Sequence, residues 1–224
     1  MLRPILTALL CFASFSLHLT AADLSPAETN QLLGKLQEHR AKFPSLTADF
    51  TEEKTLHILA KPITSQGSLS FQAPNKFKRE QRGDNRSTMV SNGQKLWIYY
   101  PNFNRAELYT LGKEKFFDEA IEALTAGLNF QHVSDYYKTS ATHDGDGYHL
   151  KLVPKGGGLK RLLKQLIVDL EEDYKIARTT TVLPGPDGDQ VVTTYHNQHP
   201  APVPASVFDY TPPAGASIVQ PLGK

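Results

Sequence analysis

The chain has 224 residues, of which 40% are hydrophobic, and it carries 24 lysines and arginines against 23 aspartates and glutamates. The net charge of +1 creates no overall field that would favour nucleic acid as a partner. The length is enough for one sizeable hydrophobic core, and because no repeat or linker divides the sequence we expect a single domain over residues 23–224.

Residues 1–22 have the pattern of a secretory signal peptide. A positive charge at Arg3 precedes a mostly apolar run over residues 5–19, and small residues follow before Asp23. A transmembrane anchor is the alternative, but the run is shorter than about 20 residues and polar residues interrupt it. We therefore expect cleavage before Asp23 and export to the periplasm.

The cysteine at position 11 lies within this segment and is the only one in the chain. Lipidation of Cys11 is the alternative to its removal, although the bulky Leu10 before it argues against a lipidation signal. Without Cys11 the mature chain has no thiol and no disulfide, so its stability must come from its core.

Residues 25–43 carry the signals of an amphipathic helix. Ser25 is a suitable N-cap, Pro26 suits the first helical position, and Glu28 completes a capping box. Pro44 is expected to end the helix. The predicted apolar stripe is Leu32, Leu33, Leu36 and Phe43, and the predicted solvent-facing side is Glu38, Arg40 and Lys42.

From Ser45 the apolar period changes from helical to two, which is typical of half-buried strands. Strands are predicted over residues 46–53, 63–73 and 75–81, with a Pro74-Asn75 corner between the second and third. Residues 88–100 predict a hairpin, and Asn92-Gly93 at its centre indicates a type I′ turn with positive φ at both residues.

The second half of the chain begins with a strand over residues 105–111 and an amphipathic helix over residues 113–129. Further strands are predicted over residues 136–143, 148–154, 164–172, 175–184, 190–198 and 207–210. The Pro-rich residues 199–215 suggest extended chain on the surface. With about ten short strands and two helices, the chain is mainly β (α+β), with an antiparallel sheet of meander type.

Motifs for catalysis or metal binding are absent from the sequence. The eight histidines have no zinc-like spacing, and Asp144-Gly145-Asp146-Gly147 lacks a glutamate at the twelfth position of a calcium loop, so we expect a hairpin turn there. No nucleophile motif occurs, and we expect no catalytic residue, no metal and no cofactor. An enzyme remains an alternative because catalytic triads assemble in space rather than in sequence.

Residues 154–164 contain three glycines followed by a basic run. The spacing does not match a phosphate-binding loop, so a mobile loop is one interpretation. The other is a basic patch that meets anionic headgroups or an acidic partner. The residues of this patch are Lys155, Lys160, Arg161 and Lys164.

Four stretches in order resemble the outer-membrane lipoprotein carrier family, LolA. They are "SLTADFTE", with Glu52 where the family's Phe-x-Gln pattern has Gln, then "SQGSLSFQAPNKFKRE", "VSNGQKLWIYYP" and "FDYTPPAGASIV". Together with the capped helix, the resemblance spans roughly residues 25–219.

This resemblance implies an incompletely closed antiparallel β-barrel of about ten to eleven strands, with helices forming a lid over an apolar cavity. Proteins of this family carry the acyl chains of lipoproteins across the periplasm, from an inner-membrane ABC lipoprotein-release transporter toward the outer membrane or an acceptor there. They use no cofactor and do no covalent chemistry, and we expect a monomer.

The residues expected to line the cavity or its lid are apolar and come from the predicted sheet and from both predicted helices. The same residues would also suit an ordinary closed core, and that alternative stays open. The candidates are Leu32, Leu36, Leu46, Phe50, Leu69, Phe71, Phe77, Leu96, Ile98, Phe117, Ile121 and Leu124.

One position departs from the family pattern. The residue before Pro-Asn is commonly Arg in the family and is thought to hold the lid, but here it is Ala73. Arg79 is a possible substitute only if its side chain points inward. A lipid- or lipoprotein-sensing accessory domain that signals to a membrane partner is the second functional alternative, and an exported enzyme is the third.

Overall fold

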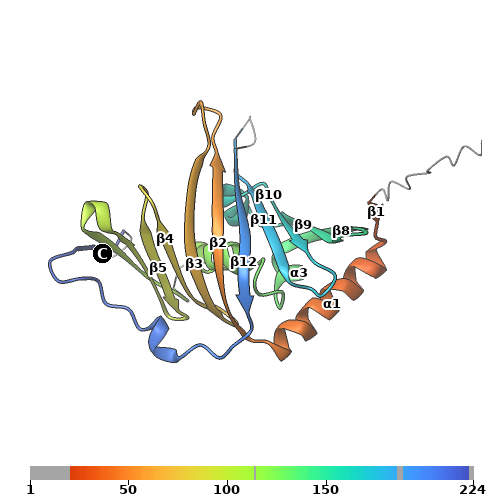
Figure 1. The fold of residues 1–224 in the computed structure, drawn as a ribbon, viewed down its shortest axis with the longest axis horizontal. Helices are drawn as coiled ribbons and strands as arrows, with labels where there is room; N and C mark the ends of the chain where they lie inside the picture. Colours follow the sequence, from red (N-terminus) through yellow and green to blue (C-terminus); the bar gives the residue numbers. More distant parts are fainter. Residues whose placement is uncertain (1–20, 114, 186–188, 222–224) are drawn as a thin grey trace, which may run out of the picture.

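The computed structural model describes residues 21–113, 115–185 and 189–221, so nearly all of the predicted signal peptide lies outside the described residues. The described chain forms one sheet of 13 strands with helices packed against it (Figure 1). The strands are β1 (Ala22–Asp23), β2 (Ser45–Thr55), β3 (Ile63–Gln72), β4 (Lys76–Arg82), β5 (Ser87–Asn92), β6 (Lys95–Tyr100), β7 (Arg105–Thr110), β8 (Tyr137–Asp144), β9 (Gly147–Pro154), β10 (Gln165–Leu170), β11 (Ile176–Val182), β12 (Gln190–His199) and β13 (Ser217–Val219). The helices are α1 (Pro26–Lys42), α2 (Lys115–Thr125), α3 (Val133–Tyr136) and α4 (Gly157–Leu162), with 3₁₀ turns η1 (Pro101–Phe103) and η2 (Ala205–Phe208).

The sheet consists of two meanders joined along one edge. Its order is β1-β8-β9-β10-β11-β12-β2-β3-β4-β5-β6-β7-β13, so β12 pairs with β2 and connects the two halves. Neighbouring strands run antiparallel except β7 and β13, and among the described residues the outermost strands β1 and β13 do not pair with each other. The predicted open antiparallel barrel is thus confirmed. It has more strands than expected because β1 and β13 have only 2 and 3 residues, too few to show a period of two.

Helix α1 begins as predicted. The Ser25 hydroxyl accepts a hydrogen bond from the Glu28 backbone N–H at 3.3 Å, and the Glu28 carboxylate accepts one from the Ser25 N–H at 2.8 Å. This reciprocal capping box satisfies two backbone donors at the helix start. The leucines of the predicted stripe are buried: Leu32, Leu33 and Leu36.

The last turn of α1 differs from the prediction at two positions. Arg40, expected to face water, is only 5% exposed, and its guanidinium lies 5.7 Å from the centre of the Phe71 ring. Its Nη1 donates to the Phe43 carbonyl at 3.1 Å, and burial lowers the pKa of Arg40 to about 10. Phe43, expected in the apolar stripe, follows the helix as its C-cap and is 41% exposed.

The Pro74-Asn75 corner joins β3 to β4 as predicted, and the Ala73–Pro74 peptide bond is cis. The next hairpin also forms, but its turn lies one residue later than predicted. Ser91 pairs with Leu96, so Gly93 and Gln94 connect the strands and Gly93 alone has positive φ, at 88°. The Asn92 side chain instead accepts hydrogen bonds from the N–H groups of Gln94 and Lys95. Asn92 thus shapes this turn through its side chain, and the predicted type I′ turn at Asn92-Gly93 is wrong.

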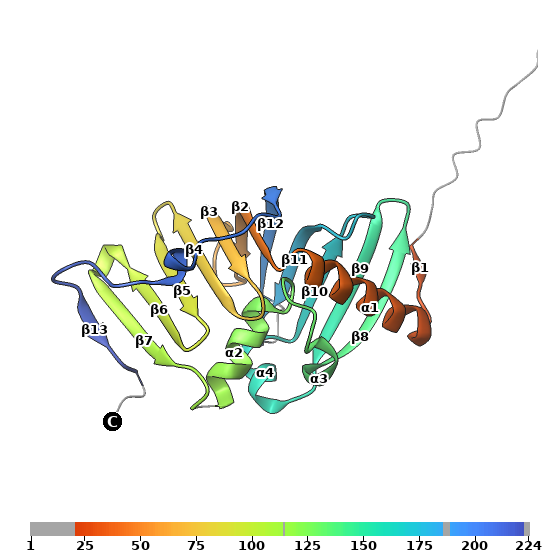
Figure 2. The same cartoon turned by 90° about the horizontal axis from the view of Figure 1, so that it is seen from below.

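Figure 2 shows α1, α2, α3 and α4 on the same face of the curved sheet. The C-terminal segment packs on strands β4 and β5 through η2, where Phe208 is buried and the Tyr210 ring lies edge-on to Trp97. The predicted strand over residues 207–210 is therefore wrong. The predicted loop at residues 154–164 is also wrong, since it contains α4, and the helix expected over 113–129 is the shorter α2.

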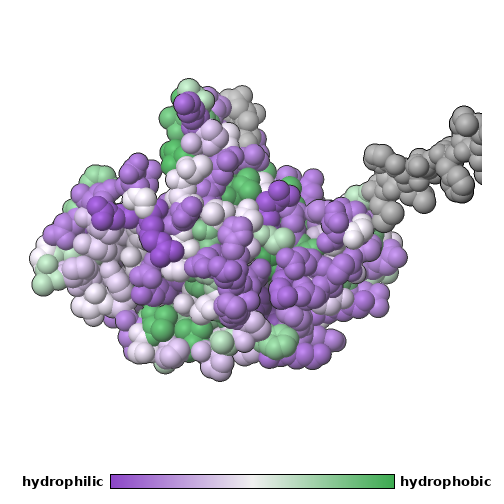
Figure 3. All heavy atoms as spheres, in the orientation of Figure 1, coloured by the Kyte–Doolittle hydropathy of each residue, from purple (hydrophilic) through white to green (hydrophobic). Residues whose placement is uncertain are grey.

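The strands seen from the face shown in Figure 3 are mostly hydrophilic. Apolar residues gather at the tip of the projecting β2–β3 hairpin, where Ile58 and Leu59 are exposed. Within the described ranges, no helix is long and apolar enough to cross a bilayer.

Candidate functional site

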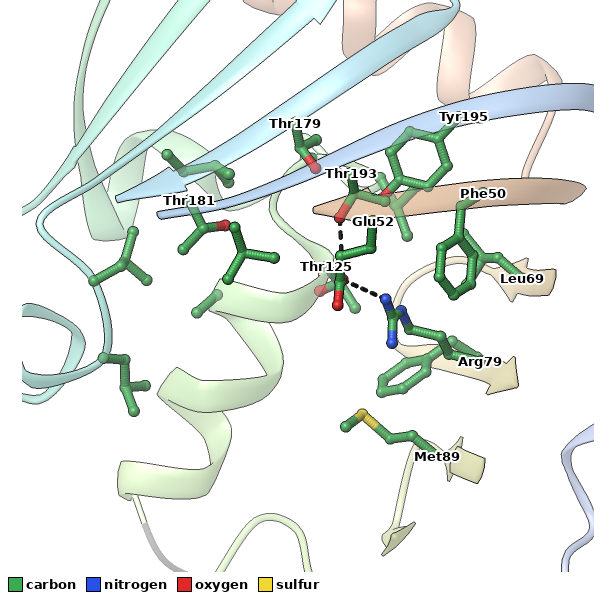
Figure 4. A pocket seen from close by; sticks show the side chains of 18 of the residues that line it. Phe50, Glu52, Leu69, Arg79, Met89, Thr125, Thr179, Thr181, Thr193 and Tyr195 are labelled. Carbon is green, nitrogen blue, oxygen red and sulfur yellow. Dashed lines mark hydrogen bonds and ion pairs between the residues drawn. The ribbon is translucent and has the colours of Figure 1, made fainter. Parts of the chain in front are cut away.

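A cavity of about 480 Å³ lies between the inner face of the sheet and helices α2 and α4 (Figure 4). Its size is typical of sites for small ligands. The lining residues come from both halves of the sheet, with β2 and β12 in the middle. They are Phe50, Glu52, Lys54, Leu69, Phe77, Arg79, Met89, Ala120, Ala123, Thr125, Gly127, Leu128, Leu162, Leu163, Leu166, Thr179, Thr181, Leu183, Val191, Thr193 and Tyr195.

Strand alternation decides which side chains reach this cavity. On β2 the buried residues Leu46, Ala48 and Phe50 share one face, and the same alternation brings Glu52 and Lys54 to the cavity. The inner face of β2 therefore changes along its length from apolar to charged.

One wall of the cavity is apolar. Phe50, Leu69, Phe77 and Met89 come from β2 to β5, and Leu162 and Leu163 approach from α4 and its end. Helix α2 presents the small side chains of Ala120 and Ala123, which cover the space without filling it. Such a wall suits hydrocarbon, because each methylene moved out of water gains about 0.8 kcal/mol.

The sheet side of the cavity also has a polar wall, which contains an ion pair on β2 and β4, the strands that carry Phe50 and Phe77. Arg79 Nη2 donates to Glu52 Oε2 at 2.5 Å, and both side chains are largely buried. The Thr193 hydroxyl donates to the same Glu52 oxygen at 3.3 Å, and Arg79 Nη1 donates to Gln81 Oε1 at 2.9 Å. Figure 4 shows Glu52, Arg79 and Thr193 pointing toward one another inside the cavity. Burial raises the pKa of the neighbouring Tyr195, which keeps its hydroxyl protonated.

A glycine on β3 makes room for this arrangement. The Phe50 ring lies over Gly67, where an added Cβ would come within 2.2 Å of Phe50 Cζ. The guanidinium of Arg79 lies 4.1 Å from the centre of the same ring. Gly67, Phe50 and Arg79 thus form a stack in which a cation–π contact and the Glu52 pair both fix the guanidinium.

The structure distributes the predicted lipid-binding residues over several places. Phe50, Leu69 and Phe77 line the cavity. Leu32, Leu36, Leu46, Phe71, Leu96 and Ile121 are buried in the core beside it, and Ile98 packs against that core. The side chains of Phe117 and Leu124 lie outside the described residues. Sequence reasoning missed the polar wall, although Glu52 lies at an inward position of β2 and Arg79 lies two residues after the inward Phe77.

Two hydrogen bonds join the segment that follows α2 to the Pro74-Asn75 corner and to α1. The buried Asn129 side chain, just after α2, donates to the Pro74 carbonyl at 3.0 Å. Gln37 Nε2 of α1 donates to the Phe130 carbonyl at 2.9 Å. Ala73 donates its backbone N–H to the Pro44 carbonyl and packs against the core. The partners of Arg79, the other predicted gating residue, lie on the sheet in the described chain.

The four residues of the predicted basic patch are exposed on and around α4. The ammonium groups of Lys155 and Lys164 donate to the carbonyls of Ser134 and Gly185. The glycine run next to them accommodates a side chain from α2, because an added Cβ at Gly158 would overlap the Glu119 carboxylate. These glycines therefore permit close packing of α4 against α2.

A second polar cluster lies on β8, β9 and β10. His149 bonds to Asp169 and Asp144 at 2.8 Å each, and these hydrogen bonds raise the pKa of His149. The Asp144 carboxylate also accepts from the N–H groups of Asp146 and Gly147, which confirms the predicted turn. Within the part of the chain that the structure describes, no group of His, Cys, Asp and Glu is placed to hold a metal ion.

Comparison with known proteins agrees with this architecture. The family model described as outer membrane lipoprotein carrier protein LolA matches residues 41–211. The outer-membrane lipoprotein carrier protein of Methylibium petroleiphilum is 26% identical over 223 residues, which cover 95% of each chain. The corresponding protein of Pectobacterium carotovorum is 27% identical over 183 residues, covering 82% of this chain and 85% of its own.

Among solved structures, an uncharacterized conserved protein from Thermus thermophilus superposes with a TM-score of 0.50 at 10% identity, covering 85% of this chain and 98% of its own. That similarity shows a shared fold. The family model covers most of the chain, and the resemblance found in the four sequence stretches is thereby confirmed. The chain belongs to the LolA family of outer membrane lipoprotein carrier proteins.

Proposed function

We propose that the protein is a periplasmic carrier that shields the acyl chains of lipoproteins, or of related lipids, and moves them from the inner to the outer membrane. The observation that carries this proposal is the cavity of about 480 Å³ with an apolar wall under α2 and α4. An acyl chain in water costs about 0.8 kcal/mol per exposed methylene, so a carrier must cover it during transit. Membership of the LolA family supports the same conclusion.

The proposed cycle involves binding alone, without covalent chemistry or a cofactor. The carrier receives its cargo from an inner-membrane ABC transporter and delivers it to the outer membrane or to an acceptor there. In this proposal α2 moves away from the sheet during loading, and the hydrogen bond from Asn129, four residues after α2, to Pro74 restrains that movement. The exposed cations around α4 are proposed to contact lipid headgroups or an acidic partner during transfer: Lys155, Lys160, Arg161 and Lys164.

The test is capture of an acyl ligand by the purified mature protein. Wild-type protein is expected to bind a fluorescent fatty acyl probe and to retain an acylated lipoprotein in native mass spectrometry. Phe77→Glu should weaken probe binding by more than about tenfold, because it places a charge in the apolar wall.

Gln66→Glu is the matched control, since it adds the same charge at an exposed position of β3. Circular dichroism of both variants separates loss of binding from loss of folding. If wild-type protein captures no acyl ligand, or if both variants bind it equally well, the carrier proposal is wrong.

A further inference from the structure

A cavity that holds only hydrocarbon has no use for an ion pair in its lining such as the one between Glu52 and Arg79. Removing two charges from water is costly, and an apolar pair of similar volume is often as stable or more stable. The pair nevertheless lies in the cavity wall, with Thr193 bonded to it. The two side chains are 22% and 17% exposed, so a polar group of a ligand in the cavity can reach them.

The strand register extends this polar wall into a row. Glu52 of β2 lies opposite Thr193 of β12, and Thr193 lies opposite Thr179 of β11. All three line the cavity, and Figure 4 shows them on adjacent strands with Arg79 at one end. We call Arg79, Glu52, Thr193 and Thr179 the polar row.

The polar row has unused hydrogen-bonding capacity in the described structure. A guanidinium has five N–H donors, and Arg79 uses one for Glu52 and one for Gln81. The hydrogen bonds from Arg79 and Thr193 both go to Glu52 Oε2, which leaves Oε1 available as an acceptor in the described chain. A ligand group that both accepts and donates, or only accepts, can therefore bind here.

The charges of the row favour a neutral polar group. Glu52 neutralises Arg79 at 2.5 Å, so the pair offers hydrogen bonds rather than a net charge. Lys54, one inward position further along β2, lines the same cavity outside the row, and binding of a carboxylate to it is the competing outcome that palmitate tests. The apolar wall begins directly next to the row, since the Phe50 ring is in contact with Arg79.

Taking these observations together, we propose that the polar row binds the ester or amide linkage, with its neighbouring hydroxyl, that joins an acyl chain to its headgroup. The chain itself lies along the apolar wall. This inference rests on the proposed function and specifies it: the cavity selects acylated glycerol or amide ligands over plain hydrocarbon and free fatty acid. Glu52 and Arg79 are the residues that determine this specificity.

The experiment compares ligands with the same hydrocarbon chain and different head groups. Monopalmitoyl glycerol, palmitate and hexadecane compete with a fluorescent acyl probe for wild-type protein at neutral pH. Monopalmitoyl glycerol should bind about tenfold more tightly than hexadecane, the gain expected from a hydrogen bond to a charged group. Glu52→Leu/Arg79→Leu should remove this preference while hexadecane binding stays equal or becomes tighter.

Both partners are replaced together because a single replacement would leave a buried charge unpaired. Glu53→Leu/Arg82→Leu is the matched control, since it removes the same two charges from exposed positions on the same two strands. Thr193→Val, paired with Thr194→Val as its control on the next position of β12, provides a milder test. Only Thr193→Val should reduce the preference for monopalmitoyl glycerol.

Each outcome separates this inference from the proposed function. If Glu52→Leu/Arg79→Leu and Thr193→Val both keep the preference, the polar row is not the binding site for the linkage, although the carrier function stands. If palmitate binds most tightly and Lys54→Gln removes that preference, the site binds a carboxylate and the inference is wrong. If no ligand binds wild-type protein, the carrier proposal itself fails.

Discussion

Helices α1 and α2 were both expected to cover the cavity, yet they contact different parts of the molecule. Helix α1 buries Leu32, Leu33 and Leu36 in the core, and none of the described cavity-lining residues belongs to it. Helix α2 also anchors Ile121 in the core, but it turns Ala120 and Ala123 to the cavity. One helix therefore supports the sheet, and the other forms a wall of the site.

This difference bears on which helix moves. The capping box and three buried leucines fix α1, and opening it would expose core residues to water. The cavity beneath α2 means that part of its inner side has no packed neighbour. Elements with fewer packed contacts open at lower free energy, so we infer that cargo enters by displacement of α2.

The largest expected effect comes from truncating the core face of α1. Leu36 is 1% exposed, and Leu36→Ala should lower the free energy of unfolding by about 2–5 kcal/mol, because a buried side chain is lost and a cavity remains. Urea unfolding measures the change, with Lys35→Ala at an exposed position of the same helix as the control. The acyl affinity of the folded protein should stay within about twofold of wild type. A parallel loss of affinity would mean that α1 belongs to the site.

A smaller effect, on binding rather than stability, is expected from filling the cavity from α2. Ala123→Phe should weaken acyl binding by about tenfold, since the ring occupies space that the chain needs. Probe titration measures this, and Ala123→Ser, which preserves the side-chain size, should bind as wild type does. Normal binding by Ala123→Phe would show that the acyl chain does not pass under α2.

The smallest effect concerns pH and α1. Burial, together with the positive charge of Arg40, lowers the pKa of His39 below its ordinary value of 6.5, while Asp173 opposes this. Below about pH 6.5 the unfolded chain therefore binds more protons at this site than the folded chain, so the free energy of unfolding falls as the pH falls toward the folded-state pKa. Urea unfolding at several pH values should show a shallower decline for His39→Gln than for wild type. Identical slopes would show that His39 does not couple protonation to stability.

Local features of the structure were predictable from the sequence. The capping box at Ser25 and Glu28 spans one helical turn, and the strands follow from a period of two. The short helix α4 was missed because its glycines are poor helix formers, and it packs against the Glu119 carboxylate of a distant helix. Tertiary packing of this kind leaves no signal in the local sequence.

The inward placement of Arg40 and Glu52 was not predicted, for the same reason: residue type was considered before position in the helix or strand. Arg40 lies four residues after Leu36 and so on the same face of α1, and Glu52 lies two residues after Phe50 on the same face of β2. Both positions pointed inward by periodicity, but Arg40 was assigned to the solvent side because of its charge and Glu52 was not named as a site residue. The partner of Glu52 could not be predicted from the sequence. Arg79 lies on β4, which is separated from β2 by β3, and its side chain extends over Gly67 of β3 to meet Glu52.

The glycine beneath Phe50 limits which substitutions this cavity tolerates. Gly67 is absent from the cavity lining, yet an added Cβ there would come within 2.2 Å of both Phe50 Cζ and the Glu80 backbone carbonyl oxygen, so the ring that holds the guanidinium of Arg79 would have to move. Movement of the Phe50 ring would disturb its contact with the Arg79 guanidinium, and with it the geometry of the ion pair between Arg79 and Glu52. If the polar row binds the linkage as proposed, a substitution at position 67 would therefore change the ligand preference without entering the cavity lining.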